Sequence, residues 1–100
     1  MATQTVTRPE LDSETKLCPM YRVLIHNDDV TPMDFVVYVL VDIFKLESAR
    51  AIDVMMEAHH RGVAHVVTEA LEKAEFHVDQ ARSLARGRSY PLTFSIEPET

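Results

Sequence analysis

The stretch that decides the fold is YRVLIHNDDVTPMDFV, residues 21–36. Its first half alternates apolar and polar side chains, with Tyr21, Val23 and Ile25 on one side, which is typical of a β-strand with one buried face. The Asn-Asp-Asp run at 27–29 consists of poor strand residues and good turn residues. We therefore predict a strand that ends in an acidic turn.

A helix is predicted to begin directly after this turn. Thr31 suits the N-cap, Pro32 suits the first helical position, and Asp34 can reach back in a capping-box arrangement. The apolar residues that follow recur at helical spacing: Phe35, Val36, Val39, Leu40 and Ile43. Strand end, turn and helix start thus meet at one point, where loops commonly carry function.

The rest of the chain predicts four further elements. A second helix starts around residues 45–48 and stops at Gly62, with Ile52, Met55, Ala58 and His59 on one face. A short strand is expected at 63–68, a third helix from 69 to about 86 closed by Gly87, and a last strand at 91–96. In the third helix we expect an apolar set made of Leu71, Ala74, Phe76, Val78, Ala81, Leu84 and Ala85.

The order β-α-α-β-α-β predicts a small single α/β domain of two layers. In this fold class three helices cover a three-stranded antiparallel sheet. Residues 1–19 hold mostly polar side chains and two prolines, with apolar residues too scattered for a helical stripe. We interpret 1–19 as a flexible N-terminal extension and 20–100 as the domain.

The amino-acid composition limits the kinds of partner that the protein can bind. A net charge of −6 argues against nucleic acid and against anionic membranes, because both require a basic surface. The longest apolar run, 35–41, is too short to cross a bilayer, and the chain does not open like a signal peptide. The single cysteine, Cys18, is consistent with a reducing compartment. We expect a cytoplasmic protein with a protein or peptide partner.

The acidic turn has two interpretations. In the simpler one, Asn27 and the two aspartates only form the turn, and Asp29 helps Thr31 to cap the helix. In the other, His59 ends the apolar stripe that contains Met55, so that a buried imidazole needs hydrogen-bond partners such as Asn27. An apolar slot with acceptors at its mouth would suit a ligand that carries hydrophobic bulk beside a cationic donor.

Metal binding and catalysis are weaker interpretations. Histidines are frequent near carboxylates, but the adjacent pair His59 and His60 would point about 100° apart on a helix, and no ligand spacing matches a familiar site. A hydrolase based on Asp28 and Asp29 would need a substrate cleft and separated pKa values. No nucleophile elbow, P-loop or glycine-rich turn is present. We expect no enzymatic activity, no metal and no cofactor.

The chain resembles the ClpS adaptor family through nearly its whole core. The resemblance is carried by residues 21–29, by the Thr-Pro-Met-Asp-Phe-Val string at 31–36, by Met55 with His59-His60-x-Gly62, and by Pro91-Leu92. It implies an adaptor that binds proteins with a bulky N-terminal residue (an N-degron: Phe, Tyr, Trp or Leu). It also implies delivery of those proteins to a ClpA or ClpC type AAA+ unfoldase of the Clp protease.

The same resemblance implies roles for single residues. Asn27, Asp28 and His59 would hold the free α-amino group of the substrate. The side-chain pocket would be lined by Ile25, Thr31, Met33, Val36, Met55, Ala58 and Leu92. Docking on the N-terminal domain of the unfoldase would involve Glu72, Glu75 and His77, and the N-terminal extension would engage the pore of the unfoldase.

Two departures from the family pattern change the expectations. Ala58 replaces the usual valine, which predicts a wider pocket that favours aromatic rings over leucine. His77 replaces a lysine on the docking surface, which suggests a divergent paralogue. A competing hypothesis is a regulator that occupies the unfoldase without carrying cargo. Such a regulator would have no reason to keep Asn27, Asp28 and His59 together.

Overall fold

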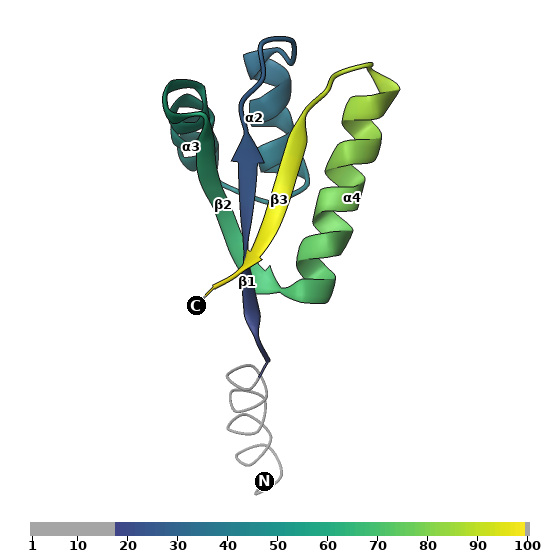
Figure 1. Ribbon diagram of the computed structural model, residues 1–100. Coiled ribbons are helices and arrows are strands. Elements are labelled where there is room, and N and C mark those ends of the chain that lie inside the picture. The colour runs from purple at the N-terminus through teal and green to yellow at the C-terminus, as the bar shows by residue number, and fades with distance from the viewer. Residues whose placement is uncertain (1–17, 100) are drawn as a thin grey trace, which may run out of the picture.

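The computed structural model describes residues 18–99, and it has the predicted order of elements (Figure 1). The elements are β1 (Met20–His26), α2 (Met33–Asp42), α3 (Ser48–Arg61), β2 (Val63–Ala70), α4 (Leu71–Gly87) and β3 (Thr93–Pro98). Of the N-terminal extension predicted at 1–19, residues 1–17 lie outside the described part of the chain. The first strand begins at Met20.

The sheet has three antiparallel strands in the order β2-β1-β3, as predicted. Ile25 in the central strand lies opposite Ala64 on one side and Phe94 on the other. The β1–β2 register shifts between Val23 and Leu24, because β2 holds one extra residue there, Val66. Such a bulge increases the local twist of the strand that contains it.

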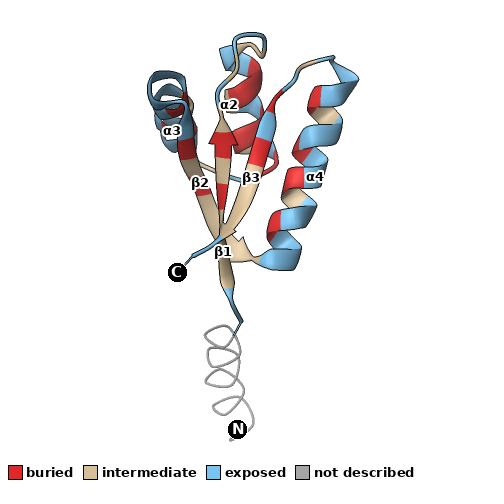
Figure 2. Cartoon of the chain, in the orientation of Figure 1, coloured by how far each residue is buried: buried red, intermediate tan, exposed pale blue. Residues whose placement is uncertain are grey.

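One face of the sheet carries the core and the other is polar. Val23 and Ile25 are buried, whereas the alternate positions of β1 point to the open face. On that open face Arg22 forms a salt bridge of 2.6 Å with Glu97 across the strands. All three helices lie along the apolar side, and in Figure 2 the buried residues of α4 follow its side toward the sheet.

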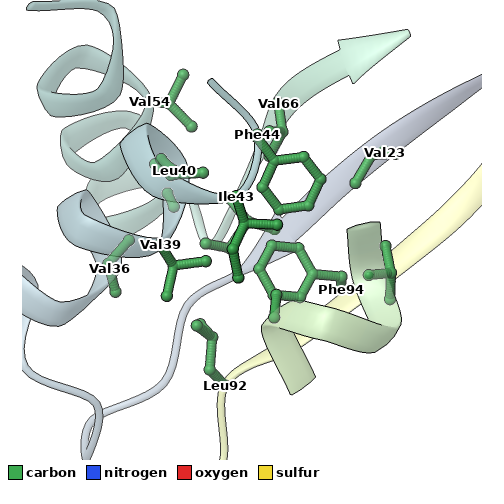
Figure 3. Packing of buried hydrophobic residues seen from close by; sticks show 14 of the residues in the cluster. Val23, Val36, Val39, Leu40, Ile43, Phe44, Val54, Val66, Leu92 and Phe94 are labelled. Carbon is green, nitrogen blue, oxygen red and sulfur yellow. The ribbon is translucent and has the colours of Figure 1, made fainter. Parts of the chain in front are cut away.

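The helices fill this core from several directions. Figure 3 shows Leu40 of α2 and Val54 of α3 among the side chains that come from the sheet, and both are fully buried. Phe44, just after α2, packs against Phe94 of β3 with ring centroids 5.5 Å apart. Each large apolar side chain buried in this way stabilises the fold by roughly 1.5 to 3 kcal/mol.

The predicted start of α2 is wrong in detail. The helix begins at Met33, its N-cap position is Pro32, and no side chain caps it. Thr31 lies one residue before the cap, and its hydroxyl donates to Asp28 instead. The first helical turn closes through the backbone, where the Val36 amide donates to the Pro32 carbonyl at 3.2 Å.

The predicted core faces of the other two helices are partly wrong. In α3 Ile52 is 47% exposed, and the buried positions are Ala51, Val54 and Ala58. In α4 Leu71 and Phe76 are exposed, and the buried positions are Ala74, Val78, Ala81 and Ala85. Most of these buried positions hold alanine, which allows a helix to pack close to its neighbours. Gly87 is the last residue of α4 and not the residue after it.

Candidate functional site

A hollow of about 180 Å³ lies where the end of β1, the following loop, the start of α2 and the end of α3 meet. Leu92, just before β3, completes it. All ten residues predicted for the amine site and the side-chain pocket line this one hollow. They are Ile25, Asn27, Asp28, Thr31, Met33, Val36, Met55, Ala58, His59 and Leu92.

The loop after β1 is attached to the end of α3 by one backbone hydrogen bond. The Asn27 amide donates to the Gly62 carbonyl at 2.9 Å. Gly62 ends α3 in the left-handed region, with φ of 91°, and its own amide donates to the Ala58 carbonyl at 2.8 Å. Asn27 is thereby held beside the last helical turn, which carries Ala58 and His59.

Asp28 organises the loop through its carboxylate. Its Oδ1 accepts hydrogen bonds from the amides of Val30 (2.8 Å) and Thr31 (2.7 Å), and its Oδ2 accepts one from the Thr31 hydroxyl (2.8 Å). Partial burial raises the pKa of Asp28, but these three hydrogen bonds outweigh it, so that the pKa lies below its ordinary value. The group is therefore ionised at neutral pH, with acceptor capacity left for a ligand.

The wall of the hollow is apolar. Ile25, Val36, Ala58 and Leu92 are buried, and Met33 lies at the rim with 44% exposure. An apolar cavity of about 150 Å³ is large enough to bind benzene in other proteins. A hollow of about 180 Å³ is therefore large enough for an aromatic side chain.

The environment of His59 differs from the one that the sequence predicted. The sequence predicted a buried imidazole, but the side chain is exposed, with its ring centroid 5.4 Å from that of His60. The prediction was wrong because the stripe that contains Met55 ends at the mouth of the hollow and not inside the core. Exposure leaves the ring nitrogens of His59 accessible to a ligand.

The mouth of the hollow can stabilise a cation. Asn27, Asp28, Asp29 and His59 supply acceptor atoms, and no lysine or arginine lines the hollow. Within residues 18–99 no group of three or more His, Cys, Asp or Glu side chains is placed to hold a metal ion. Over the same residues, no helix is both long enough and apolar enough to span a membrane.

Two lining residues were not predicted, His26 and Asp29. Asp29 could have been found from its place beside Asp28 in the acidic turn. His26 gave no such signal, because strand alternation assigns it to the open face of the sheet. There its Nε2 lies 2.7 Å from the Ser95 hydroxyl.

The predicted docking residues do not share one environment. Glu72 and Glu75 are exposed near the start of α4. His77 turns inward: its Nδ1 lies 3.0 Å from Glu69 Oε1, and its ring packs edge-on against Phe44 with centroids 5.6 Å apart. The two glutamates are thus fully displayed on the surface, whereas His77 is only partly exposed.

Comparison with known proteins gives one consistent result. Residues 16–95 match the family model described as ATP-dependent Clp protease adaptor protein ClpS. The chain is 43% identical over 100 residues to the ClpS adapter protein of Synechococcus elongatus, with 99% of each chain covered. It is 37% identical to ClpS 2 of Rhizobium meliloti, with 99% of this chain and 94% of that protein covered.

A solved structure agrees with these relatives. It is that of Agrobacterium tumefaciens ClpS2 bound to L-phenylalaninamide, which superposes with a TM-score of 0.78 at 38% identity. The match covers 81% of this chain and 98% of that one. This chain therefore belongs to the ClpS family, whose members are adaptors of the ATP-dependent Clp protease and not enzymes.

Proposed function

We propose that this chain binds proteins that begin with Phe, Tyr, Trp or Leu and have a free α-amino group. We further propose that it delivers them in the cytoplasm to an AAA+ unfoldase of the ClpA or ClpC type. The observation that carries the proposal is the apolar hollow with acceptors and no cation at its mouth. A bulky side chain would enter the hollow, and the α-amine would remain at the mouth.

Both halves of such a ligand contribute to binding. Burying a large apolar side chain stabilises a complex by roughly 1.5 to 3 kcal/mol. A charged amine has three donors, and moving it out of water without partners would cost several kcal/mol. Asn27, Asp28 and a neutral His59 would supply those partners. An acetylated chain end has lost the charge and two donors, so it should bind poorly.

The ligand of a relative supports this assignment. L-phenylalaninamide, which is bound to A. tumefaciens ClpS2, combines a free α-amine with an aromatic side chain. The hollow in this chain offers an apolar wall for such a ring and carboxylate and amide oxygens for such an amine. These are the two features that an N-degron ligand requires.

The test is fluorescence anisotropy with a labelled peptide that begins in Phe. Its N-acetylated copy and a copy that begins in Ser are the reference ligands. We expect binding of the first peptide only. His59→Ala should weaken that binding by more than tenfold, because it removes one acceptor from the mouth.

His60→Ala is the matched control, since His60 is adjacent and exposed but does not line the hollow. It should leave the affinity unchanged. Equal binding of all three peptides, or of none, would favour a regulator that docks on the unfoldase without cargo. Unchanged affinity in His59→Ala would remove that residue from the site.

Delivery has its own test, with purified ClpA-protease and ClpC-protease and a Phe-started fluorescent substrate. Glu72 and Glu75 are exposed on the same helix and are the docking residues that we propose. The double variant Glu72→Lys/Glu75→Lys should slow degradation at least tenfold and leave peptide binding intact. Degradation at the wild-type rate would place the docking surface elsewhere.

A further inference from the structure

A second hollow, of about 700 Å³, lies between α2 and α4 and shares no residue with the first one. We call it the α2–α4 groove. The residues that matter for its chemistry are Tyr38, Asp42, Ile43, Phe76, Asp79 and Leu84. The groove is thus built from apolar side chains with a carboxylate on each helix.

Two exposed aromatic residues give the α2–α4 groove its character. Tyr38 is 50% exposed and Phe76 is 60% exposed, while the neighbouring Ile43 is buried. Helix α4 packs on the sheet mainly through alanines and leaves its largest apolar side chain, Phe76, in water. Exposed aromatic residues that adjoin a buried apolar floor are typical of protein docking sites.

The charge around the α2–α4 groove has one sign. Asp42 and Asp79 line it, and no lysine or arginine does. Arg82, one turn after Asp79, donates to the Phe94 carbonyl at 3.4 Å and lines a separate hollow that Asp79 also borders. In the described part of the chain, the salt bridges are Arg22–Glu97 and His77–Glu69, and neither involves these two aspartates.

We infer that the α2–α4 groove docks a segment of a partner protein in which an apolar anchor lies between arginine or lysine residues. The anchor fills the space between Tyr38 and Phe76, and the flanking cations pair with Asp42 and Asp79. This recognition combines an apolar centre with a charged rim, as in many protein interfaces. The inference is independent of the N-degron pocket.

The test uses the full ¹⁵N-labelled chain and two N-acetylated peptides, which cannot enter the α-amine site. One has a Leu-Phe centre flanked by two arginines on each side, and the other has glutamates in place of the arginines. With the arginine peptide alone, we expect amide shift changes confined to residues 38–43 and 76–84. Free phenylalaninamide, added separately, should instead shift the residues that line the first hollow.

Variants decide whether the α2–α4 groove is responsible. Phe76→Ser and Asp79→Lys should each weaken binding of the arginine peptide at least tenfold. Ile52→Ser, a comparable exposed apolar position on α3, should have no effect. No shift changes, equal shift changes with both peptides, or full binding by Phe76→Ser would overturn the inference. Self-association in sedimentation experiments that Phe76→Ser abolishes would assign the groove to a second copy and also overturn it.

Discussion

Gly62 combines two tasks, because it ends α3 and offers its carbonyl to Asn27. Its φ of 91° is costly for a residue with a side chain, although an added Cβ would meet no atom within 4 Å. Gly62→Ala should therefore lower the free energy of unfolding by about 1 to 2 kcal/mol through backbone strain alone. Urea denaturation followed by circular dichroism measures this change.

Gly87 provides the matched control. It is the last residue of α4, its backbone is not left-handed, and an added Cβ would again meet no atom within 4 Å. Gly87→Ala should stabilise the protein by about 0.4 to 1 kcal/mol, because alanine reduces the freedom of the unfolded chain. If both variants changed stability equally, the left-handed turn at Gly62 would not be the cause.

Met33 is the residue that we expect to control which side chains enter the pocket. It lies at the rim with 44% exposure, so its truncation leaves the core intact. Met33→Ala should admit peptides that begin with Ile or Val, whose branched β-carbons need more room at the entrance. Anisotropy should show their affinities rise toward that of the Phe peptide, within the roughly 1 to 3 kcal/mol by which pockets separate apolar ligands. Continued rejection of both would contradict a gating role.

Helix α3 shows which face of an element carries stability. Val54 is fully buried and Ile52 is 47% exposed, two residues earlier on the same helix. Val54→Ala should cost about 2 kcal/mol of unfolding free energy, from lost burial and the cavity left behind. Ile52→Ala should change it by less than about 0.5 kcal/mol, as is usual for surface positions. The denaturant midpoints of the two variants measure this difference. A larger loss of stability in Ile52→Ala than in Val54→Ala would show that the core face is the one predicted from the sequence.

The elements themselves could be predicted from the sequence, but their exact faces could not. Alternation placed β1, and Gly62 placed the end of α3, because both signals are local. Ile52 and Phe76 were assigned to the core by hydrophobicity, but both are exposed, and on α3 the structure buries the adjacent Ala51 instead. Close packing of a helix selects small residues, and the distance between helix and sheet cannot be read from one segment.

The candidate site was largely predictable, because its residues belong to a long and distinctive string around the acidic turn. All ten predicted lining residues surround one hollow. What failed was the environment of single groups. Thr31 donates to Asp28 and caps no helix, and His59 is exposed. Thr31 suits an N-cap by residue type, but Asp28, three residues earlier, takes its hydroxyl, and the exposure of His59 depends on how far other segments cover the end of α3.

At the scale of the whole molecule, one face of the sheet is covered and the other carries ionisable groups. On the uncovered face, burial lowers the pKa of His65, and Arg22 and Arg50 lower it further. The Val67 carbonyl and Glu57 act in the opposite direction without reversing the shift. The folded state thus disfavours the charged imidazole, and the unfolded chain takes up the proton first as the pH falls.

His65 should therefore reduce stability as the pH falls below about 6.5, the ordinary pKa of histidine. His65→Gln should lose less unfolding free energy than the wild type between pH 7.5 and 5.5. Arg50→Gln removes one of the two cations, so its loss of unfolding free energy should lie between those of the wild type and His65→Gln. Urea denaturation at several pH values measures the slopes. A steeper loss in His65→Gln would show that the folded protein favours the charged ring.

The hydrogen bond from Asn27 to Gly62 joins two segments that are distant in sequence. Closing the chain between them costs conformational entropy, which must be offset before such a non-local contact becomes favourable. The entrance that we assign to the substrate amine is consequently absent from any fragment that stops before α3 ends. A chain still being synthesised therefore has no complete entrance of this kind until Gly62 has been added and α3 has closed.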